Sequence, residues 1–249
     1  MNIALAQLES ALRQRCTALP LFLRDDDVVE DEPSLRQLLA LCARHELPIN
    51  LAVIPGRLTE SAINYLKQPS GLIELHQHGW QHVNHETTGK KCEFGASRDY
   101  AAQRADLAAG QAQMNAAFGT NWFPAFTPPW NRCTATTASA LVELGFRALS
   151  RDASQPSFDD PGLPELPVTL DLFRWREGAT LRSLNELTDE LSRQIANADR
   201  IGIMLHHQVM DDAAFALLDE WLAVLKQSPL VQFHTLQSLP TAQCLMHID

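Results

Sequence analysis

Short apolar runs alternate with longer amphipathic segments along the whole chain. The runs that predict strands cover residues 21–24, 49–54, 73–76, 123–127, 146–150, 168–173, 201–205 and 231–235. Between them, apolar residues repeat at helical spacing over 35–42, 184–195 and 215–225, and the segments 97–118 and 134–144 also predict helices. Strands that alternate with helices in this way indicate a parallel sheet built from right-handed β-α-β units.

The number of these units favours a closed arrangement of the sheet. Seven or eight strand–helix units are about the number that makes a parallel barrel, and 249 residues suit a single barrel. We therefore expect one domain over residues 1–249. The segment 152–167 is rich in Pro, Asp and Ser and is expected to form a long surface loop.

Composition narrows the possible partners. The net charge is −10 and no stripe of Lys and Arg is present, so nucleic acid is not expected as a partner. The five cysteines are scattered and form no CxxC pair, which argues against a disulfide framework or a cysteine zinc site. The N-terminal segment contains Glu9 and Arg13 where a signal peptide needs an apolar run, and no stretch has the roughly 20 apolar residues of a membrane span. These features predict a cytoplasmic protein without a membrane partner, and they leave the oligomeric state open.

Polar side chains gather where four of the predicted strands end. In parallel α/β folds, active sites form at the carboxyl ends of the strands. Asp25, Asp26 and Asp27 follow the first strand, and four histidines lie within residues 76–85 after the third. The group Thr127, Pro128, Pro129, Trp130 and Asn131 follows the strand at 123–127, and His206 and His207 follow the strand at 201–205. These groups are expected to meet on one rim.

The histidines and aspartates together suggest metal chemistry. His78 and His82 are four residues apart, and catalytic zinc usually has three protein ligands, so a carboxylate from another strand would complete the set. Three adjacent carboxylates repel one another, and a metal would relieve that repulsion for one of them. A second aspartate could then act as a general base and a late histidine as a general acid.

Four motifs in order resemble the NodB-homology polysaccharide deacetylases. They are RDDDV (24–28), HGWQH (78–82), FTPPWN (126–131) and IMLHH (203–207), and they span most of the chain. The resemblance implies a distorted (β/α) barrel with about seven parallel strands and the hydrolysis of an N-acetyl or similar amide. It also implies one divalent metal ion, most simply zinc, and a saccharide or another small molecule as the substrate.

The resemblance also implies roles for individual residues. Asp26 would be the general base, and His206 the general acid with His207 as its rival, although the run of three aspartates leaves the register open. The metal ligands would be Asp27, His78 and His82. The residues expected at the substrate are Trp80, Thr127, Pro129, Trp130 and Asn131.

Two departures from the family pattern point to a divergent branch. Thr127 stands where the third motif carries an arginine that orients the base, and Arg24, Arg132 or Arg151 could replace it. The fourth motif, an Asp near a Trp, has Asp152 as its nearest counterpart. A member of a divergent branch is expected to act on a small amide and not on a polymer such as chitin or peptidoglycan.

Two other functions remain open from the sequence. An amidohydrolase- or PHP-like hydrolase would use His76 and His78 as an HxH pair and would favour two metals. A barrel that has lost catalysis would only bind carbohydrate, and the missing arginine of the third motif is the feature that favours it.

Overall fold

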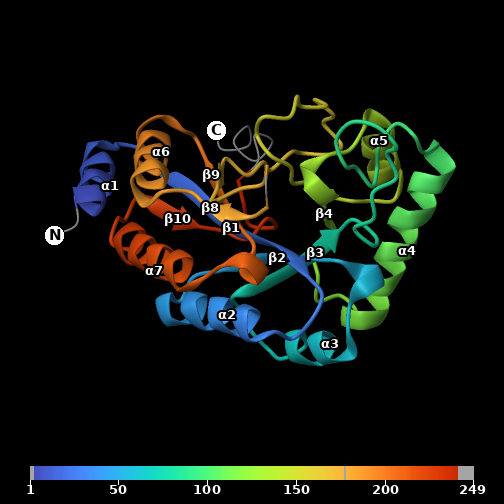
Figure 1. The fold of residues 1–249 in the computed structure, drawn as a ribbon, viewed down its shortest axis with the longest axis horizontal. Coiled ribbons are helices and arrows are strands. Elements are labelled where there is room, and N and C mark those ends of the chain that lie inside the picture. Colours follow the sequence, from blue (N-terminus) through green and yellow to red (C-terminus); the bar gives the residue numbers. More distant parts are fainter. Residues whose placement is uncertain (1–2, 177, 241–249) are drawn as a thin grey trace, which may run out of the picture.

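The centre of the fold is one curved sheet of parallel strands. The computed structural model describes residues 3–176 and 178–240 (Figure 1). Within these residues the strand order is β5-β4-β3-β2-β1-β9-β6, and β10 pairs with the start of β1. The strands are β1 Leu19–Val28, β2 Ile49–Val53, β3 Ile73–His78, β4 Ala125–Thr127, β5 Ala148–Leu149, β6 Leu170–Asp171, β9 Ile201–Leu205 and β10 Val231–Phe233. The predicted distorted (β/α) barrel with about seven parallel strands is confirmed.

The two edges of this sheet are joined by residues 165–171. Leu166 and Val168 donate backbone hydrogen bonds to the carbonyls of Leu149 and Arg151, beside β5, and β6 then pairs with β9. The end of the segment predicted to be a surface loop therefore belongs to the barrel wall. Beyond it, β7 Phe173–Arg174 and β8 Thr180–Leu181 form a separate antiparallel pair.

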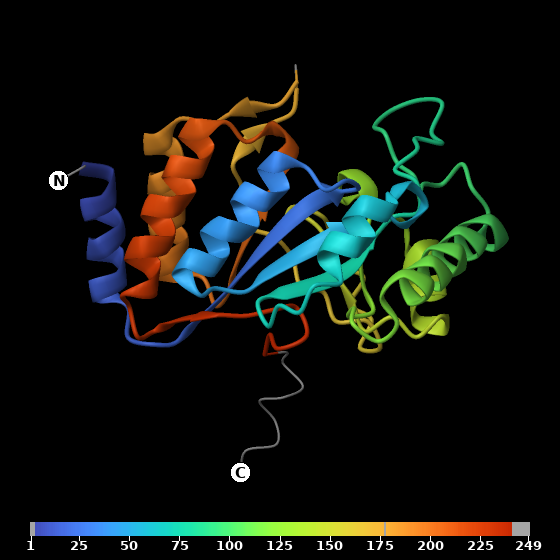
Figure 2. The same cartoon turned by 90° about the horizontal axis from the view of Figure 1, so that it is seen from below.

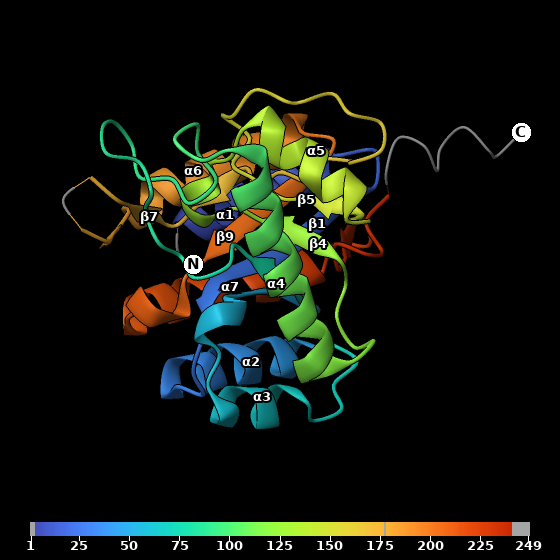
Figure 3. The ribbon, with the colours of Figure 1, turned by 90° about the vertical axis from the view of Figure 1, so that its right-hand side faces the viewer.

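Helices cover the outside of the sheet. In Figure 1 the order of the helices around the strands is α1, α6, α7, α2, α3, α4 and α5. Figure 2 shows α1, α7 and α2 side by side. Their bounds are α1 Ile3–Gln14, α2 Pro33–His45, α3 Glu60–Leu66, α4 Tyr100–Phe118, α5 Ala135–Glu143, α6 Leu184–Asn197 and α7 Asp212–Lys226. The long helix α4 lies beside α5 (Figure 3) and begins only at Tyr100, because the Asp99 side chain caps the amide of Ala102. None of the helices in the described ranges is both long and apolar enough to cross a membrane.

Alternation along the strands separates two apolar clusters. On β1, Leu21 and Leu23 pack in the layer between the sheet and the helices, whereas Phe22 packs inside the barrel with Met204 of β9. Side chains that follow one another in a strand point to opposite faces. The sequence had indicated that the three aspartates follow the first strand. Strand β1 instead continues to Val28, so the aspartates lie within it.

The barrel interior is tight where Gly202 of β9 lies opposite Phe22 of β1. A Cβ atom added to Gly202 would lie 2.7 Å from Phe22 Cε1 and 2.8 Å from the carbonyl oxygen of Pro167. We therefore expect Gly202→Ala to lower the free energy of unfolding by about 1–3 kcal/mol through overpacking. Urea unfolding followed by circular dichroism measures this change. Gly71→Ala is the matched control, because nothing lies within 4 Å of a Cβ there, and it should change stability by less than about 0.5 kcal/mol. Equal losses in the two variants would contradict the packing argument.

Candidate active site

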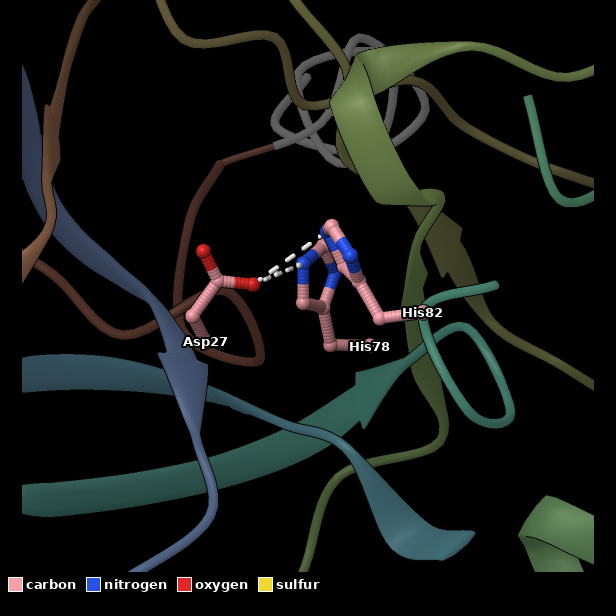
Figure 4. Close-up of side chains that lie close together, drawn as sticks. All are labelled: Asp27, His78 and His82. Atoms are coloured by element: carbon pink, nitrogen blue, oxygen red, sulfur yellow. Dashed lines mark ion pairs between the residues drawn. The ribbon is translucent and has the colours of Figure 1, made fainter. Parts of the chain in front are cut away.

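Asp27, His78 and His82 come together at the carboxyl ends of β1 and β3. The Oδ1 atom of Asp27 lies 3.2 Å from Nε2 of His78 and 3.3 Å from Nε2 of His82. Figure 4 shows both imidazoles directed at this carboxylate oxygen. Zinc–ligand bonds of about 2.0–2.2 Å in a tetrahedral arrangement place neighbouring ligand atoms roughly 3.3–3.6 Å apart. The spacing around the carboxylate therefore fits a single small metal ion.

Hydrogen bonding around the triad also fits a metal. Nδ1 of His78 lies 3.0 Å from the carbonyl oxygen of Thr127, which can only accept a hydrogen bond, so Nδ1 carries the proton and Nε2 keeps its lone pair free. Oδ1 of Asp27 is buried and receives no hydrogen bond. A buried carboxylate oxygen without a hydrogen-bond donor is costly, and a divalent cation would satisfy it.

The electrostatics shift the pKa values of the three side chains in different directions. Burial raises the pKa of Asp27, but the imidazoles of His78 and His82 lower it more, so the net shift is downward. Burial, followed by the charge of neighbouring His78, lowers the pKa of His82 to about 4. Burial also lowers the pKa of His78, but Asp27 and Asp26 outweigh that effect and the net shift is upward. At neutral pH Asp27 is therefore ionised and His82 is neutral, the states in which a carboxylate and an imidazole can bind a cation.

Uncommon backbone conformations position Asp27 and His82. Asp27 has φ 68° and His82 has φ 58°, both in the left-handed region that costs energy for residues other than glycine. Gly79 has φ 59°, and a Cβ there would lie 2.7 Å from Pro129 Cδ. The turn between the two histidines therefore requires glycine at this position.

Glu93 holds the same turn in place, and sequence reasoning missed it. Its carboxylate is fully buried and accepts the backbone N–H groups of Trp80 at 3.1 Å and Gln81 at 2.8 Å. One signal for it was present: an acidic residue between Cys92 and Phe94, both of which are buried. A buried carboxylate that accepts several backbone amides fixes a loop without a charged partner.

Arg24 orients Asp26. Its Nε and Nη2 atoms donate to the two carboxylate oxygens of Asp26 at 2.8 Å each, and both side chains are buried. Burial raises the pKa of Asp26, but the Arg24 charge opposes this most strongly and the net shift is downward. Of the three arginines considered from the sequence, Arg132 donates to the carbonyl of Lys91 and Arg151 pairs with Glu165. The arginine contact expected from the third motif is thus made by Arg24, on the same strand as Asp26.

His206 and His207 lie in different surroundings. His206 lines the cavity that contains Asp26 and Asp27, and the ring of Trp175 lies 4.5 Å from its ring, centroid to centroid. His207 is fully buried and outside that lining, with Nδ1 2.6 Å from Oδ2 of Asp25. His206 is therefore the one placed where it could meet a substrate.

Asp171 and Trp175 supply an acid–tryptophan pair that sequence reasoning missed. Trp175 Nε1 donates to Oδ2 of Asp171 at 2.7 Å, and both residues line the cavity beside His206. Burial raises the pKa of Asp171. Asp152, the nearest counterpart by sequence, also lines the cavity, where its carboxylate accepts the amide of Ser154. The segment DLFRW (171–175) was the signal for the pair.

The cavity has a volume of about 330 Å³, and only some of the expected substrate residues line it. Trp130 and Asn131 do, with the Trp130 ring 4.3 Å from that of His82, centroid to centroid. Thr127 and Pro129 are buried behind the lining, and Trp80 packs against the apolar cluster around Phe94 and Phe126. A larger hollow of about 540 Å³ beside Ile73 and Phe123 lies at the amino ends of the strands and contains none of the groups described above.

His76 is not part of the metal-compatible group. Its Nε2 atom lies 2.9 Å from the hydroxyl of Thr127, and burial, followed by the Arg24 charge, lowers its pKa to about 3. Among the described residues, the His, Cys, Asp and Glu side chains close enough to share an ion are Asp27, His78 and His82. His76 and His78, the HxH pair of the amidohydrolase-like alternative, are therefore not arranged to bind one metal ion together.

Comparison with solved structures identifies the fold. No family model matches the sequence, and no curated protein matches it either. A Mycobacterium smegmatis protein assigned to the polysaccharide deacetylases aligns with a TM-score of 0.67 at 16% identity, covering 89% of this chain and 88% of the other. The allantoinase PuuE aligns with a TM-score of 0.65 at 13% identity and 88% coverage of both chains. A family 4 acetyl xylan esterase from Clostridium thermocellum, in complex with cobalt, gives 0.58 at 17% identity and 88% coverage of both. The chain has the NodB-type fold that its motifs indicated.

Metal binding tests the triad directly. We expect the purified protein to bind one divalent ion per chain, measured by elemental analysis after dialysis against zinc. His82→Ala should weaken binding by more than the roughly 10–100-fold typical for loss of a residue that only orients a ligand. His76→Gln is the matched control, because its ring contacts the Thr127 hydroxyl and not the triad, and it should keep the stoichiometry. Two ions per chain, or loss of binding in the control alone, would favour the HxH alternative.

Proposed function

We propose that this chain is a divergent NodB-type, metal-dependent hydrolase that removes an acetyl or similar acyl group from an amide nitrogen. One observation carries the proposal: a three-ligand site, a buried carboxylate outside it and an imidazole all line the same cavity. Asp27, His78 and His82 are the proposed ligands of one divalent ion, with zinc as the simplest choice. Such an ion supplies Lewis acidity, which polarises a carbonyl and lowers the pKa of water to about 7.

Asp26 is the proposed general base. Its pKa is held low by Arg24, so it is ionised at neutral pH and can take a proton from the attacking water. The two hydrogen bonds from Arg24 fix the plane of the carboxylate, so the oxygens keep one direction during the reaction. Asp26 lines the same cavity as Asp27, His78 and His82, and the charge of His78 also contributes to lowering its pKa.

His206 is the proposed general acid. It lines the same cavity as Asp26, and its charge contributes to lowering the pKa of that carboxyl. When the C–N bond of the tetrahedral intermediate breaks, the electron pair stays on nitrogen, and the proton from the His206 imidazolium converts that nitrogen into a neutral amine. The acyl group leaves as a carboxylic acid. The proton that Asp26 took from water passes through solvent to His206, which restores both groups for the next cycle.

The cavity favours a compact substrate. Its volume of about 330 Å³ lies at the low end of the range for small-molecule pockets, and Trp130 and Trp175 offer ring faces along it. A single sugar unit or a small amide would fill it. The Clostridium thermocellum neighbour acts on acetyl xylan and PuuE is an allantoinase, so this fold supports both an acetylated carbohydrate and a small ureide as substrates.

Removing the carboxylate of Asp26 tests the base. Asp26→Asn keeps the shape of the side chain, and we expect kcat to fall by about 10²–10⁴-fold with one metal ion still bound. The measurement is the release of acetate, formate or amine from a panel of N-acetylated sugars, small amides and ureides. Wild-type activity retained in the variant would refute the assignment of the base. If the wild type itself releases nothing but binds sugars from the panel, the barrel is a carbohydrate-binding module.

Arg24→Lys tests the orientation of that base. Lysine keeps the positive charge but presents a point donor in place of the two-pronged guanidinium. Losing one of two hydrogen bonds to a charged group costs about 1.5–3 kcal/mol, so we expect kcat to fall roughly 10–150-fold with KM nearly constant. Steady-state kinetics measures both constants, and thermal unfolding confirms that the variant is folded. An unchanged kcat would show that Asp26 does not depend on Arg24.

A further inference from the structure

Asp25 and His207 form a buried ion pair that has no place in the chemistry described above. Both side chains are fully buried. Oδ2 of Asp25 lies 2.6 Å from Nδ1 of His207, and Oδ1 accepts the backbone N–H of the same histidine at 2.8 Å. The carboxylate therefore holds both the ring and the backbone of His207, which fixes its direction as well as its position.

This pair joins the two chain segments that carry the proposed base and acid. Asp25 precedes Asp26 on β1, and His207 follows His206 at the end of β9. The two strands are neighbours, with Asp25 opposite Leu205. The carboxylate reaches past the end of β9 to the first residue of the short 3₁₀ turn η3 (His207–Val209), the point at which His206 leaves the strand.

The position of Asp25 on the strand is otherwise apolar. Asp25 follows Leu21 and Leu23 at alternate positions of β1, and these two leucines pack in the layer between sheet and helices. An apolar side chain would continue that layer, and buried ion pairs seldom stabilise a fold more than well-packed apolar groups do. Packing alone does not account for an acid here, whereas a requirement for a fixed geometry between β1 and η3 does.

We propose that Asp25 and His207 are positioning residues that fix His206 relative to Asp26, so that one substrate meets both acid and base. The inference rests on the proposed function. The two side chains lie on the helix side of the sheet and touch neither substrate nor metal. They act through the backbone that links Asp25 to Asp26 and His207 to His206. A second, exposed hydrogen bond also holds the turn η3 against β1: Gln208 Nε2 donates to the carbonyl oxygen of Asp27 at 3.1 Å.

The positioning role has a specific kinetic consequence. A misplaced acid slows only reactions whose leaving group must be protonated. 4′-Nitroacetanilide and p-nitrophenyl acetate share the acetyl group and the nitrophenyl ring, but the first releases an amine that needs a proton and the second a phenolate that leaves without one. The ratio of the two rates therefore reports the placement of His206 and not the general state of the site.

The experiment compares the two substrates in the zinc-loaded protein. For His207→Phe and Asp25→Leu we expect kcat on the anilide to fall about 10–100-fold, part of the contribution of a general acid, with kcat on the ester within about threefold of wild type. Asp25→Asn keeps the side-chain shape and one acceptor for the His207 backbone, so it should recover part of the anilide rate. His206→Ala sets the limit of the effect.

The control is a buried hydrogen bond far from the site. Thr188→Val removes the contact of the Thr188 hydroxyl with Trp221 Nε1, between α6 and α7, and should lower the Tm while leaving the anilide-to-ester ratio unchanged. Equal losses on both substrates in the Asp25 and His207 variants, including Asp25→Asn, would make the pair merely structural and overturn the inference. A wild-type protein that cleaves neither substrate nor any amide of the panel overturns the proposed function, and the inference with it.

Discussion

Three consecutive carboxylates on one buried strand impose the constraint around which this molecule is arranged. Ionised groups so close together in a low-dielectric interior repel strongly unless each meets its own positive or donating partner. Strand alternation makes this possible by sending Asp25 to the helix side of the sheet and Asp26 into the barrel. Asp25 meets His207, Asp26 meets Arg24, and Asp27 turns through a left-handed conformation toward His78 and His82.

This division of partners determines which parts of the chain must converge. Each aspartate of β1 is matched by a different segment: the turn that follows β9, the strand β1 itself, and the end of β3 with the turn after it. The barrel wall therefore cannot shift at one place without leaving a buried charge unpaired elsewhere. Closure of the sheet by residues 165–171 restricts such shifts further, and it brings Asp171 to the same rim.

Much of the fold and the core of the site could be predicted from sequence. Hydrophobic periodicity locates the strands and helices because the core lies on one side of each element, and His78 with His82 has the spacing of a metal-ligand pair. Element ends were less certain: β4 and β5 are shorter than their apolar runs, and β1 is longer because its last buried residues are charged.

The partners of the site residues could not be predicted in the same way. Arg24 was one of three candidate arginines, and only the side-chain geometry shows that its guanidinium meets Asp26. Glu93 and Asp171 act through contacts made over loops whose paths follow no simple period. Hydrophobic periodicity indicates the face of a helix or strand on which a side chain lies. It does not indicate which group from a distant segment of the chain will contact that side chain.

The location of Arg24 has a consequence for how such a barrel can diversify. Arg24 and Asp26 are two residues apart on the same face of one strand, so their mutual orientation is set by local backbone geometry and not by the docking of a remote loop. The loop after β4 delivers no arginine to Asp26 and meets the pair through Asn131, whose Oδ1 accepts from Arg24 Nη2 at 2.8 Å. Specificity can therefore change at other positions of this loop that line the cavity, such as Trp130, while Arg24 and Asp26 keep their mutual alignment.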